Sequence, residues 1–359
     1  MTAPFFSICI PNYNYGRFIG ETIQSVLDQD YDDYEIVIAD NASTDNSLDV
    51  IESFAARDAR IRVIRNRHNI GFAPNLQRAT ETARGQYMNL LSSDDQMKAG
   101  ALRAYADAIR ETGVRDAVLF AAIENFDERG QVFKLTVKPD DGFYLRYTSP
   151  NAPPSGAAQV FDGSAVLASA LKRLKTPMPF LSTVYARTLW ERVEGYNSTR
   201  TIGPDKHFIY KVLGLNPPVV YIPRVCYRYR DAISPNKAAQ TTTLKQPMDD
   251  YLYTLEYRDE TLAPLGLTRQ DLIEAFIERV CLREGLSQLG HRHYAHAFKL
   301  LMFALASYPG TTLRRPKAYA LAGLLATGPL ASIIAPVLLS VYYREHPNEV
   351  REAAVRAQG

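Results

Sequence analysis

The chain has 359 residues, 46% of them hydrophobic, which is enough to build one large domain or two ordinary ones around a sizeable core. Its 41 basic and 39 acidic residues leave a formal net charge of +2. This balance excludes a nucleic-acid-binding protein that relies on bulk positive charge.

Three widely spaced cysteines, Cys9, Cys226 and Cys281, lie in apolar surroundings without a zinc-binding pattern. This arrangement predicts buried thiols in a reducing compartment rather than disulfides. The amino terminus runs directly into the apolar segment 5–10, without the basic start and cleavage site of a signal peptide. We therefore expect a cytoplasmic protein.

Short apolar runs alternate with segments of helical periodicity over the first hundred residues. We expect strands at 5–10, 35–39, 61–64 and 86–91, with a helix between each pair. This βαβαβαβ order is typical of a mostly parallel sheet flanked by crossover helices. Ser43 or Thr44 is the expected cap of the second helix, and Gly85 is the expected end of the third.

Ligands of such sheets bind at the loops that leave the carboxyl ends of the strands. These loops are polar or acidic here: Pro11-Asn12-Tyr13-Asn14, Asp40 to Asp45, and Ser92-Ser93-Asp94-Asp95. Neither GxGxxG nor GxxxxGK[ST] follows the first strand, so both glycine-rich phosphate-binding loops are excluded.

Acidic side chains repel phosphate, so an acidic site binds a nucleotide only through its base and ribose and through a divalent cation on the diphosphate. Asp40 could accept a base N–H, Asp94 could accept from ribose hydroxyls, and Asp95 could hold Mg²⁺ or Mn²⁺. A cation in that place also stabilises a departing diphosphate. The pattern indicates group transfer from a nucleotide-activated donor.

The order and spacing of several motifs resemble the family 2 glycosyltransferases, which have the Rossmann-like GT-A fold. The resemblance covers residues 5–232 and rests on PNYN (11–14), EIVIADNASTD (35–45), NIGFAPNLQRA (69–79), ARGQYMNLLSSDD (83–95) and the region around Asp205. It implies that Pro11, Asn12, Tyr13 and Asp40 line the nucleotide pocket. It also implies that Asp94 contacts the ribose and Asp95 the metal ion.

By the same resemblance, Asp205 is the general base that takes a proton from the acceptor hydroxyl. Sugar transfer is then a direct, inverting displacement, with a UDP-sugar or dTDP-sugar as the implied donor. The chain departs from the family pattern at Asn41, Ser92 and Pro204, where an acidic residue is common. No QxxRW motif follows, which favours the addition of single sugars over processive synthesis.

Simpler interpretations of these residues exist. Asp94 and Asp95 could cap the following helix, and Asp205 could serve only as a helix cap. Arg228 and Arg230 could reach the diphosphate or be ordinary strand charges. The segment HRHYAH (291–296) has no Cys or carboxylate in ligand spacing, so it indicates a turn or helix start rather than a metal site.

From about residue 240 the hydrophobic residues recur with the spacing of amphipathic helices. This change predicts a GT-A domain at 1–239 and a helical region at 240–359. No charged residue occurs between Ala318 and Tyr343, and a basic cluster at 314–317 precedes this segment. Gly328-Pro329 and Pro336 interrupt it, so we expect association with a membrane surface rather than a span.

Together these observations predict a transferase that moves one sugar from a nucleotide-sugar to a saccharide or lipid-linked acceptor in surface polysaccharide synthesis. Two alternatives stay open. A sugar-nucleotide nucleotidyltransferase would need a glycine-rich, lysine-containing loop where this chain has PNYNYGRF. A non-catalytic scaffold would keep Asp40 and Asp95 and use Asp205 only as a cap.

Overall fold

The computed structural model describes residues 3–138, 142–198, 200, 203–231, 243–330 and 334. The chain divides into two compact units. Unit 1 comprises Met1–Leu167, Thr176–Arg200 and Pro204–Ala232; unit 2 comprises Ala168–Lys175, Thr201–Gly203 and Ile233–Gly359. The predicted boundary between residues 239 and 240 lies outside the described residues and stays a prediction.

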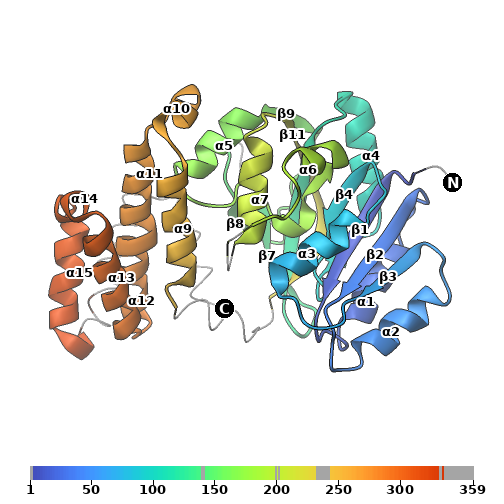
Figure 1. Cartoon of the computed structure of the whole chain (residues 1–359), viewed down its shortest axis with the longest axis horizontal. Helices are drawn as coiled ribbons and strands as arrows, with labels where there is room; N and C mark the ends of the chain where they lie inside the picture. Colours follow the sequence, from blue (N-terminus) through green and yellow to red (C-terminus); the bar gives the residue numbers. More distant parts are fainter. Residues whose placement is uncertain are drawn as a thin grey trace. The chain divides into compact units, whose positions relative to one another are not determined.

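The first part of unit 1 has the predicted βαβαβαβ order (Figure 1). Its elements are β1 (Phe6–Asn12), α1 (Ile19–Leu27), β2 (Tyr34–Asp40), α2 (Ser47–Ala55), β3 (Ile61–Arg65), α3 (Phe72–Glu81) and β4 (Tyr87–Leu90). The strands lie in the order β3-β2-β1-β4 and all pair in parallel. The carboxyl ends of these strands therefore meet at one edge, and the register places Asn12 beside Asp40.

The rest of unit 1 extends this sheet with strands of both directions. The elements are β5 (Gln96–Met97), α4 (Ala101–Thr112), β6 (Val118–Phe126), β7 (Val132–Val137), β8 (Arg146–Thr148), β9 (Gln159–Asp162), α5 (Gly163–Leu171, shared with unit 2), η1 (Phe180–Ser182), β10 (Val184–Ala186), α6 (Arg187–Arg192), α7 (Pro204–Leu213) and β11 (Pro218–Arg230). The order continues β4-β10-β6-β11-β5, in which β10 is antiparallel to both neighbours and β11 is parallel to β6. The predicted α/β class is confirmed.

Strands β2 and β6 are buried along their whole length, which explains their near-continuous apolar sequences. The three cysteines are buried free thiols, as predicted. Burial raises the pKa of each thiol, that of Cys226 to about 12. These thiols are therefore packing residues and poor nucleophiles.

Two predicted helix boundaries are wrong. Helix α2 begins at Ser47 and is not capped by Ser43 or Thr44, because the Ser43 hydroxyl is hydrogen-bonded to Asp40. Helix α3 ends at Glu81, before Gly85. A Cβ on Gly85 would lie 2.5 Å from the backbone nitrogen of Ser7, so this glycine permits close approach to β1 instead of ending the helix.

Unit 2 is helical in its described part, as predicted. Its elements are α9 (Lys245–Glu256), α10 (Asp259–Leu262), η2 (Ala263–Leu265), α11 (Arg269–Ala275), η3 (Phe276–Arg283), α12 (Glu284–Gly290), α13 (Tyr294–Ser307), α14 (Pro309–Leu313), α15 (Pro316–Ala326) and η4 (Gly328–Leu330). The π-helical segment η3 joins α11 to α12 without a break. The rings of Tyr251, Phe276 and Phe303 pack together inside the unit.

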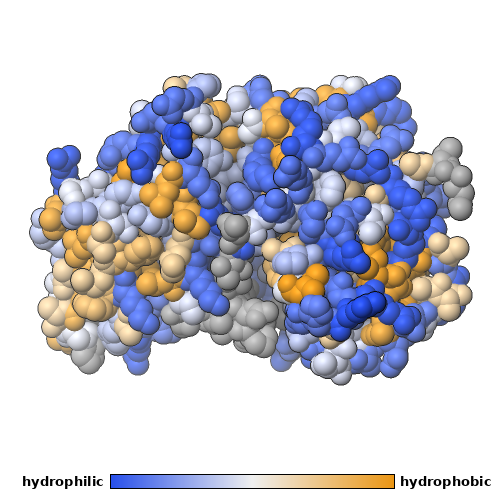
Figure 2. Space-filling view, viewed as in Figure 1, coloured by the Kyte–Doolittle hydropathy of each residue, from blue (hydrophilic) through white to orange (hydrophobic). Residues whose placement is uncertain are grey.

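The histidine-rich segment 291–296 forms a turn and the start of α13, as predicted. The apolar segment 318–343 begins within α15, whereas residues 331–333 and 335–343 lie outside the described part. No helix in the described ranges has the length and apolar character needed to cross a bilayer. Hydrophobic side chains do remain on the surface of unit 2 (Figure 2).

A buried carboxylate ties the strands of unit 1 together away from their polar ends. Glu35 in β2 accepts hydrogen bonds from the Ser7 hydroxyl of β1 at 2.7 Å and from the backbone N–H of Arg84 at 2.6 Å. Its other oxygen pairs with Arg62 of β3 at 2.9 Å. One side chain thus connects three strands and the turn before β4.

We predict that Glu35→Ala lowers the free energy of unfolding by about 3 kcal/mol, because it leaves buried donors and the Arg62 charge without their acceptor. The matched control is Glu52→Ala, which removes an exposed partner of Arg65 and should cost less than about 1 kcal/mol. Urea denaturation of both variants measures the difference. Equal losses would contradict a structural role for the Glu35 cluster.

Candidate functional site

The ends of β1 and β2 form the first half of the candidate site. Asp40 is buried, and its Oδ1 accepts hydrogen bonds from Asn12 Nδ2 at 2.9 Å and from the Ser43 hydroxyl at 2.6 Å. Its Oδ2 accepts from the backbone N–H of Ser43 at 3.0 Å. A carboxylate oxygen can accept more than one hydrogen bond, so Oδ2 can also take a ligand N–H.

Asn12 carries an unused acceptor at the same place. The side chain is fully buried, yet its Oδ1 has no hydrogen-bond partner among the described residues. Buried polar atoms are almost always paired, but neighbouring protein atoms cover this oxygen, so a ligand reaches it only after a local rearrangement. The neighbouring Tyr13 ring is 42% exposed, and Pro11 is only partly buried. These four predicted nucleotide-site residues, Pro11 to Tyr13 and Asp40, therefore lie together.

Hydrogen bonds connect this half to the loop after β4. The Ser93 hydroxyl donates to the backbone carbonyl of Pro11 at 2.9 Å, and the Thr22 hydroxyl of α1 donates to the Ser93 carbonyl at 2.9 Å. Asp94 and Asp95 follow Ser93 directly. The structure thus brings the acidic pair and Asp40 to the same edge of the sheet, as the sequence predicts.

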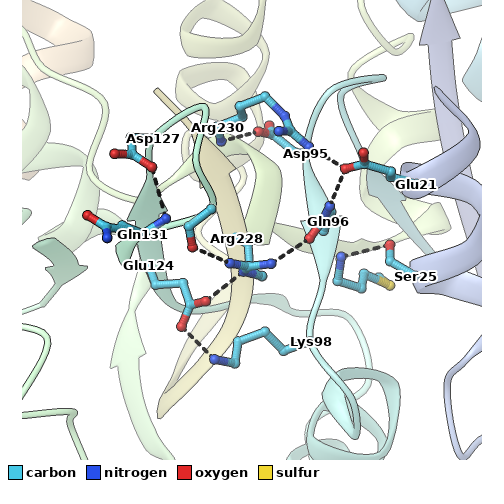
Figure 3. Close-up of polar contacts among 12 residues, drawn as sticks. Glu21, Ser25, Asp95, Gln96, Lys98, Glu124, Asp127, Gln131, Arg228 and Arg230 are labelled. Atoms are coloured by element: carbon cyan, nitrogen blue, oxygen red, sulfur yellow. Dashed lines mark hydrogen bonds and ion pairs between the residues drawn. The ribbon is translucent and has the colours of Figure 1, made fainter. Parts of the chain in front are cut away.

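The end of strand β11 holds the acidic pair from the other side (Figure 3). The backbone N–H of Arg230 donates to Asp95 Oδ1 at 2.9 Å, and its Nε donates to the Asp94 carbonyl at 3.0 Å. Its Nη2 pairs with Glu21 of α1 at 2.6 Å. The Arg230 side chain is only 7% exposed and lies over the rings of Phe18 and Phe126. Arg230 therefore fixes the position of the turn that carries Asp94 and Asp95.

A polar network continues from Glu21 along strand β5 (Figure 3). Gln96 donates to Glu21 at 2.9 Å and accepts from Arg228 at 2.9 Å, and Arg228 and Lys98 both pair with Glu124. Arg228 thus serves this network and does not contact the acidic pair. A groove of about 760 Å³ borders the network and contains none of the predicted site residues.

The negative charges of Asp94 and Asp95 are only partly offset by positive charge nearby. Burial, and next the negative charge of Asp94, raise the pKa of the Asp95 carboxyl well above its ordinary value. Burial also raises the pKa of Asp94, and the charge of Arg230 opposes this shift. Such a pair is most stable with additional positive charge nearby.

The Asp95 carboxylate fits a divalent cation such as Mg²⁺ or Mn²⁺, because these ions prefer hard carboxylate oxygens and the neighbouring Asp94 adds negative charge. Among the residues that the structure describes, no group of three or more His, Cys, Asp or Glu side chains is arranged to hold a metal. The remaining ligands would therefore come from substrate phosphates and water, as is usual for Mg²⁺.

The two capping alternatives have different outcomes. Helix α4 begins after Gly100 in a left-handed conformation, so Asp94 and Asp95 do not cap it. Asp205 is the second residue of α7, where a carboxylate interacts favourably with the helix start. Asp205 therefore stabilises the first turn of α7. This role is compatible with catalysis.

Asp205 lies in unit 1 with the other predicted residues. Helix α7 packs through Phe208 on Tyr196 and on Tyr185 of β10, the strand next to β4. Burial raises the pKa of the Asp205 carboxyl, as a general base near neutral pH requires. The catalytic role of Asp205 stays a prediction.

One functional feature escapes sequence reasoning. Asn41, a departure from the family pattern, donates to Asn69 Oδ1 at 2.9 Å and accepts from Asn66 Nδ2 at 3.1 Å and the Ile70 N–H at 3.0 Å. A carboxylate at position 41 has no proton for the Asn69 oxygen. The asparagine therefore shapes the turn before α3, and NxxN in the sequence is too common to reveal it.

The strand order and polar strand ends define this unit as a GT-A-type domain, which a solved structure supports. The crystal structure of S. aureus TarS 1-349 in complex with UDP-GlcNAc matches with a TM-score of 0.58 at 17% identity, over 96% of this chain and 92% of that one. At this identity the likeness shows the fold alone.

Sequence comparison gives the family. Residues 7–168 match the model of "Glycosyl transferase family 2". Glycosyltransferase GlyG of Streptococcus pneumoniae is 30% identical over 136 residues, which are 38% of this chain and 44% of GlyG. Chondroitin synthase of Escherichia coli is 32% identical over 130 residues, 36% of this chain and 18% of that protein. The chain thus spans less than half of these relatives, and the likeness to glycosyltransferase family 2 is shown for residues 7–168.

We predict that Arg230→Lys weakens Mn²⁺ binding roughly 10- to 100-fold, because one ammonium group cannot contact both the Asp94 carbonyl and Glu21. The measurement is Mn²⁺ titration by calorimetry in the presence of UDP. Arg228→Lys is the matched control, since it alters an arginine of the same strand that does not touch the acidic pair. Equal effects of the two substitutions would contradict a positioning role for Arg230.

Proposed function

We propose that the chain is an inverting glycosyltransferase. It moves one sugar from a nucleotide-sugar, a UDP-sugar or dTDP-sugar, to a saccharide or lipid-linked acceptor in surface polysaccharide biosynthesis. The observation that carries the proposal is the hydrogen-bonded edge that links Asp40 and Asn12 to the acidic pair. The family 2 match and the UDP-GlcNAc complex of a protein with the same fold support it.

Donor binding follows from the two halves of this edge. Asp40 accepts a hydrogen bond from the base, and the exposed Tyr13 ring offers a stacking surface for it. Asp94 accepts hydrogen bonds from ribose hydroxyls, and Asp95 would hold the divalent cation that compensates the diphosphate charge. When bound, Mg²⁺ or Mn²⁺ neutralises phosphate charge and stabilises the leaving diphosphate as a Lewis acid.

Asp205 supplies the base chemistry in this proposal. An acceptor hydroxyl is a poor nucleophile, and Asp205 takes its proton as the oxygen forms a bond to C1 of the sugar. The bond from C1 to the diphosphate oxygen breaks on the opposite face, so the configuration at C1 inverts. A carboxylate with a raised pKa holds that proton better than an ordinary aspartate, which suits this role.

The acceptor class rests on the relatives and on the apolar carboxyl-terminal region. A chondroitin synthase among the relatives supports a saccharide acceptor. We further propose that the enzyme works in the cytoplasm at the inner face of the membrane, where a lipid-linked saccharide would present its hydroxyl.

The nucleotidyltransferase alternative has no supporting feature, because the loop after β1 donates hydrogen bonds from Asn12 and has no lysine. The Asp205→Asn variant tests the scaffold alternative, because only an enzyme has a transfer activity to lose. Donor specificity and metal use are tested together by measuring the hydrolysis of a panel of sugar nucleotides with Mn²⁺ and with chelator.

We predict that Asp205→Asn keeps the affinity for UDP and lowers transfer by about 10²- to 10⁴-fold. Because burial raises the pKa of Asp205, kcat/KM of the native enzyme should rise with pH over a range above the ordinary aspartate value, as the base loses its proton. This acidic limb should be absent from the residual activity of the variant. A native protein without turnover on any donor and acceptor pair would favour a scaffold.

We predict that Asp95→Asn abolishes stabilisation by Mn²⁺ without lowering the thermal stability of the metal-free protein, because it removes a buried charge next to Asp94. At 100 times its dissociation constant, Mn²⁺ should stabilise the native protein by about 2.7 kcal/mol. Thermal unfolding with and without Mn²⁺ measures both effects. Glu111→Gln, on the exposed face of α4, is the control that should keep the full Mn²⁺ response.

A further inference from the structure

Helix α13 of unit 2 is apolar on both of its faces. It buries Ala297, Leu300 and Leu301 inside the unit, yet it leaves Phe298 53% exposed and Met302 46% exposed. These two residues are four positions apart and so lie one above the other on the helix surface. An exposed phenylalanine and methionine pair of this kind marks an interaction surface more often than an isolated apolar residue does.

Helix α15 repeats the pattern. It buries Ala318, Leu321 and Leu324, whereas Tyr319 is 61% exposed on its outer face. Ala322, Gly323 and Ala326 are also exposed and add no charge to that face. Leu313 of α14 is exposed just before the helix begins.

The outer faces of α13 and α15 belong to one surface. Both helices pack on η3 and α12 and against each other. Gly285 of α12 meets both, since a Cβ added there would lie 2.7 Å from Leu321 and 3.7 Å from the carbonyl of Ala297. The faces turned away from this shared support therefore lie side by side. Figure 2 shows hydrophobic residues gathered over these helices.

The acidic residues of the described helices of unit 2 are confined to its first part, whereas basic residues occur throughout. Residues 243–284 contain nine acidic residues: Asp249, Asp250, Glu256, Asp259, Glu260, Asp271, Glu274, Glu278 and Glu284. Residues 285–330, which include α13 to α15, contain no Asp or Glu but five basic residues: Arg292, Lys299, Arg314, Arg315 and Lys317. The apolar surface is thus bordered only by positive charge from its own helices.

Two of these basic residues are available beside the apolar side chains. Lys299 follows Phe298 and Arg314 follows Leu313; both are exposed, and neither forms an ion pair within the described residues. Arg315 and Lys317, by contrast, pair with Glu274 and Glu278 and anchor α15 to the unit.

We propose that this α13–α15 face, formed by Phe298, Met302, Leu313 and Tyr319 with Lys299 and Arg314, docks on an anionic lipid surface. Apolar side chains flanked by basic residues insert at the boundary of headgroups and acyl chains, while the cations remain at the phosphates. Tyrosine is suited to the same boundary. The inference rests on the proposed function only in assigning a purpose to this docking, namely access to a lipid-linked acceptor.

The charge pattern favours lipid over a second copy of the chain. In a two-fold symmetric dimer the same patch lies on both partners, so Lys299 and Arg314 would face a surface without a carboxylate from α13 to α15. Like charges held together without compensation oppose association. An anionic bilayer, in contrast, complements every charge on the face.

The test is sedimentation of the purified full-length chain with vesicles of phosphatidylcholine alone or with added phosphatidylglycerol. We expect binding to the anionic vesicles. The Lys299→Glu, Arg314→Glu double variant should bind at least about tenfold more weakly, since each basic residue near such a surface contributes about a factor of five. Phe298→Ser with Met302→Ser should also lose most of the binding. The matched controls, Val160→Ser and Arg110→Glu on exposed positions of unit 1, should bind like the native chain.

Three results would overturn the inference: no binding of the native chain to anionic vesicles, binding of both double variants at the native level, or a solution dimer that Phe298→Ser with Met302→Ser dissociates. Circular dichroism confirms that each variant folds. Hydrolysis of the donor is measured in parallel without vesicles. Intact hydrolysis with no vesicle binding refutes the docking face alone, whereas vesicle binding without turnover on any donor refutes the proposed function alone.

Discussion

The pair of carboxylates after β4 is the constraint on which the candidate site depends. Asp95 is buried beside the partly exposed Asp94, the two carboxylates repel each other, and burial raises the pKa of both. Arg230 offsets part of this repulsion and fixes the turn through its main chain and its side chain. The fold thus holds an unfavourable charge arrangement in place, which is common where a site is built for a cationic ligand.

Some of the other polar contacts of unit 1 stabilise the sheet, and others leave acceptor atoms for a ligand. Glu35 is fully engaged by donors from neighbouring strands, and so it contributes to the sheet. Asp40, at the opposite end of the same strands, keeps acceptor capacity for a ligand, and Asn12 holds it in place through its side-chain N–H. One pair of parallel strands therefore carries a closed polar cluster at one end and an open one at the other.

The first four strands and the meeting of Asp40 with the acidic pair were predictable because both follow from local patterns and the geometry of parallel sheets. The roles of Arg230 and Asn41 were not. Arg230 acts 135 residues away from Asp95, and no local pattern records that distance. Ser43 was misassigned as a cap because a hydroxyl near a helix start can bond to the helix or to Asp40, and only the tertiary structure selects one. The position of Asp205 relative to the acidic pair depends in the same way on long-range packing.

The pairing of β11 also affects the order in which the protein forms. Strand β5, which follows the acidic pair at once, pairs only with β11 among the described strands, through Tyr227 with Met97 and Arg228 with Gln96. The hydrogen bonds from Arg230 to Asp94 and Asp95 thus form only after more than one hundred further residues have been synthesised, whereas the partners of Ser93 in β1 and α1 precede the turn. A nascent chain that ends before β11 would lack the Arg230 contacts to these two acids, and so the candidate site is among the last parts of unit 1 to be completed.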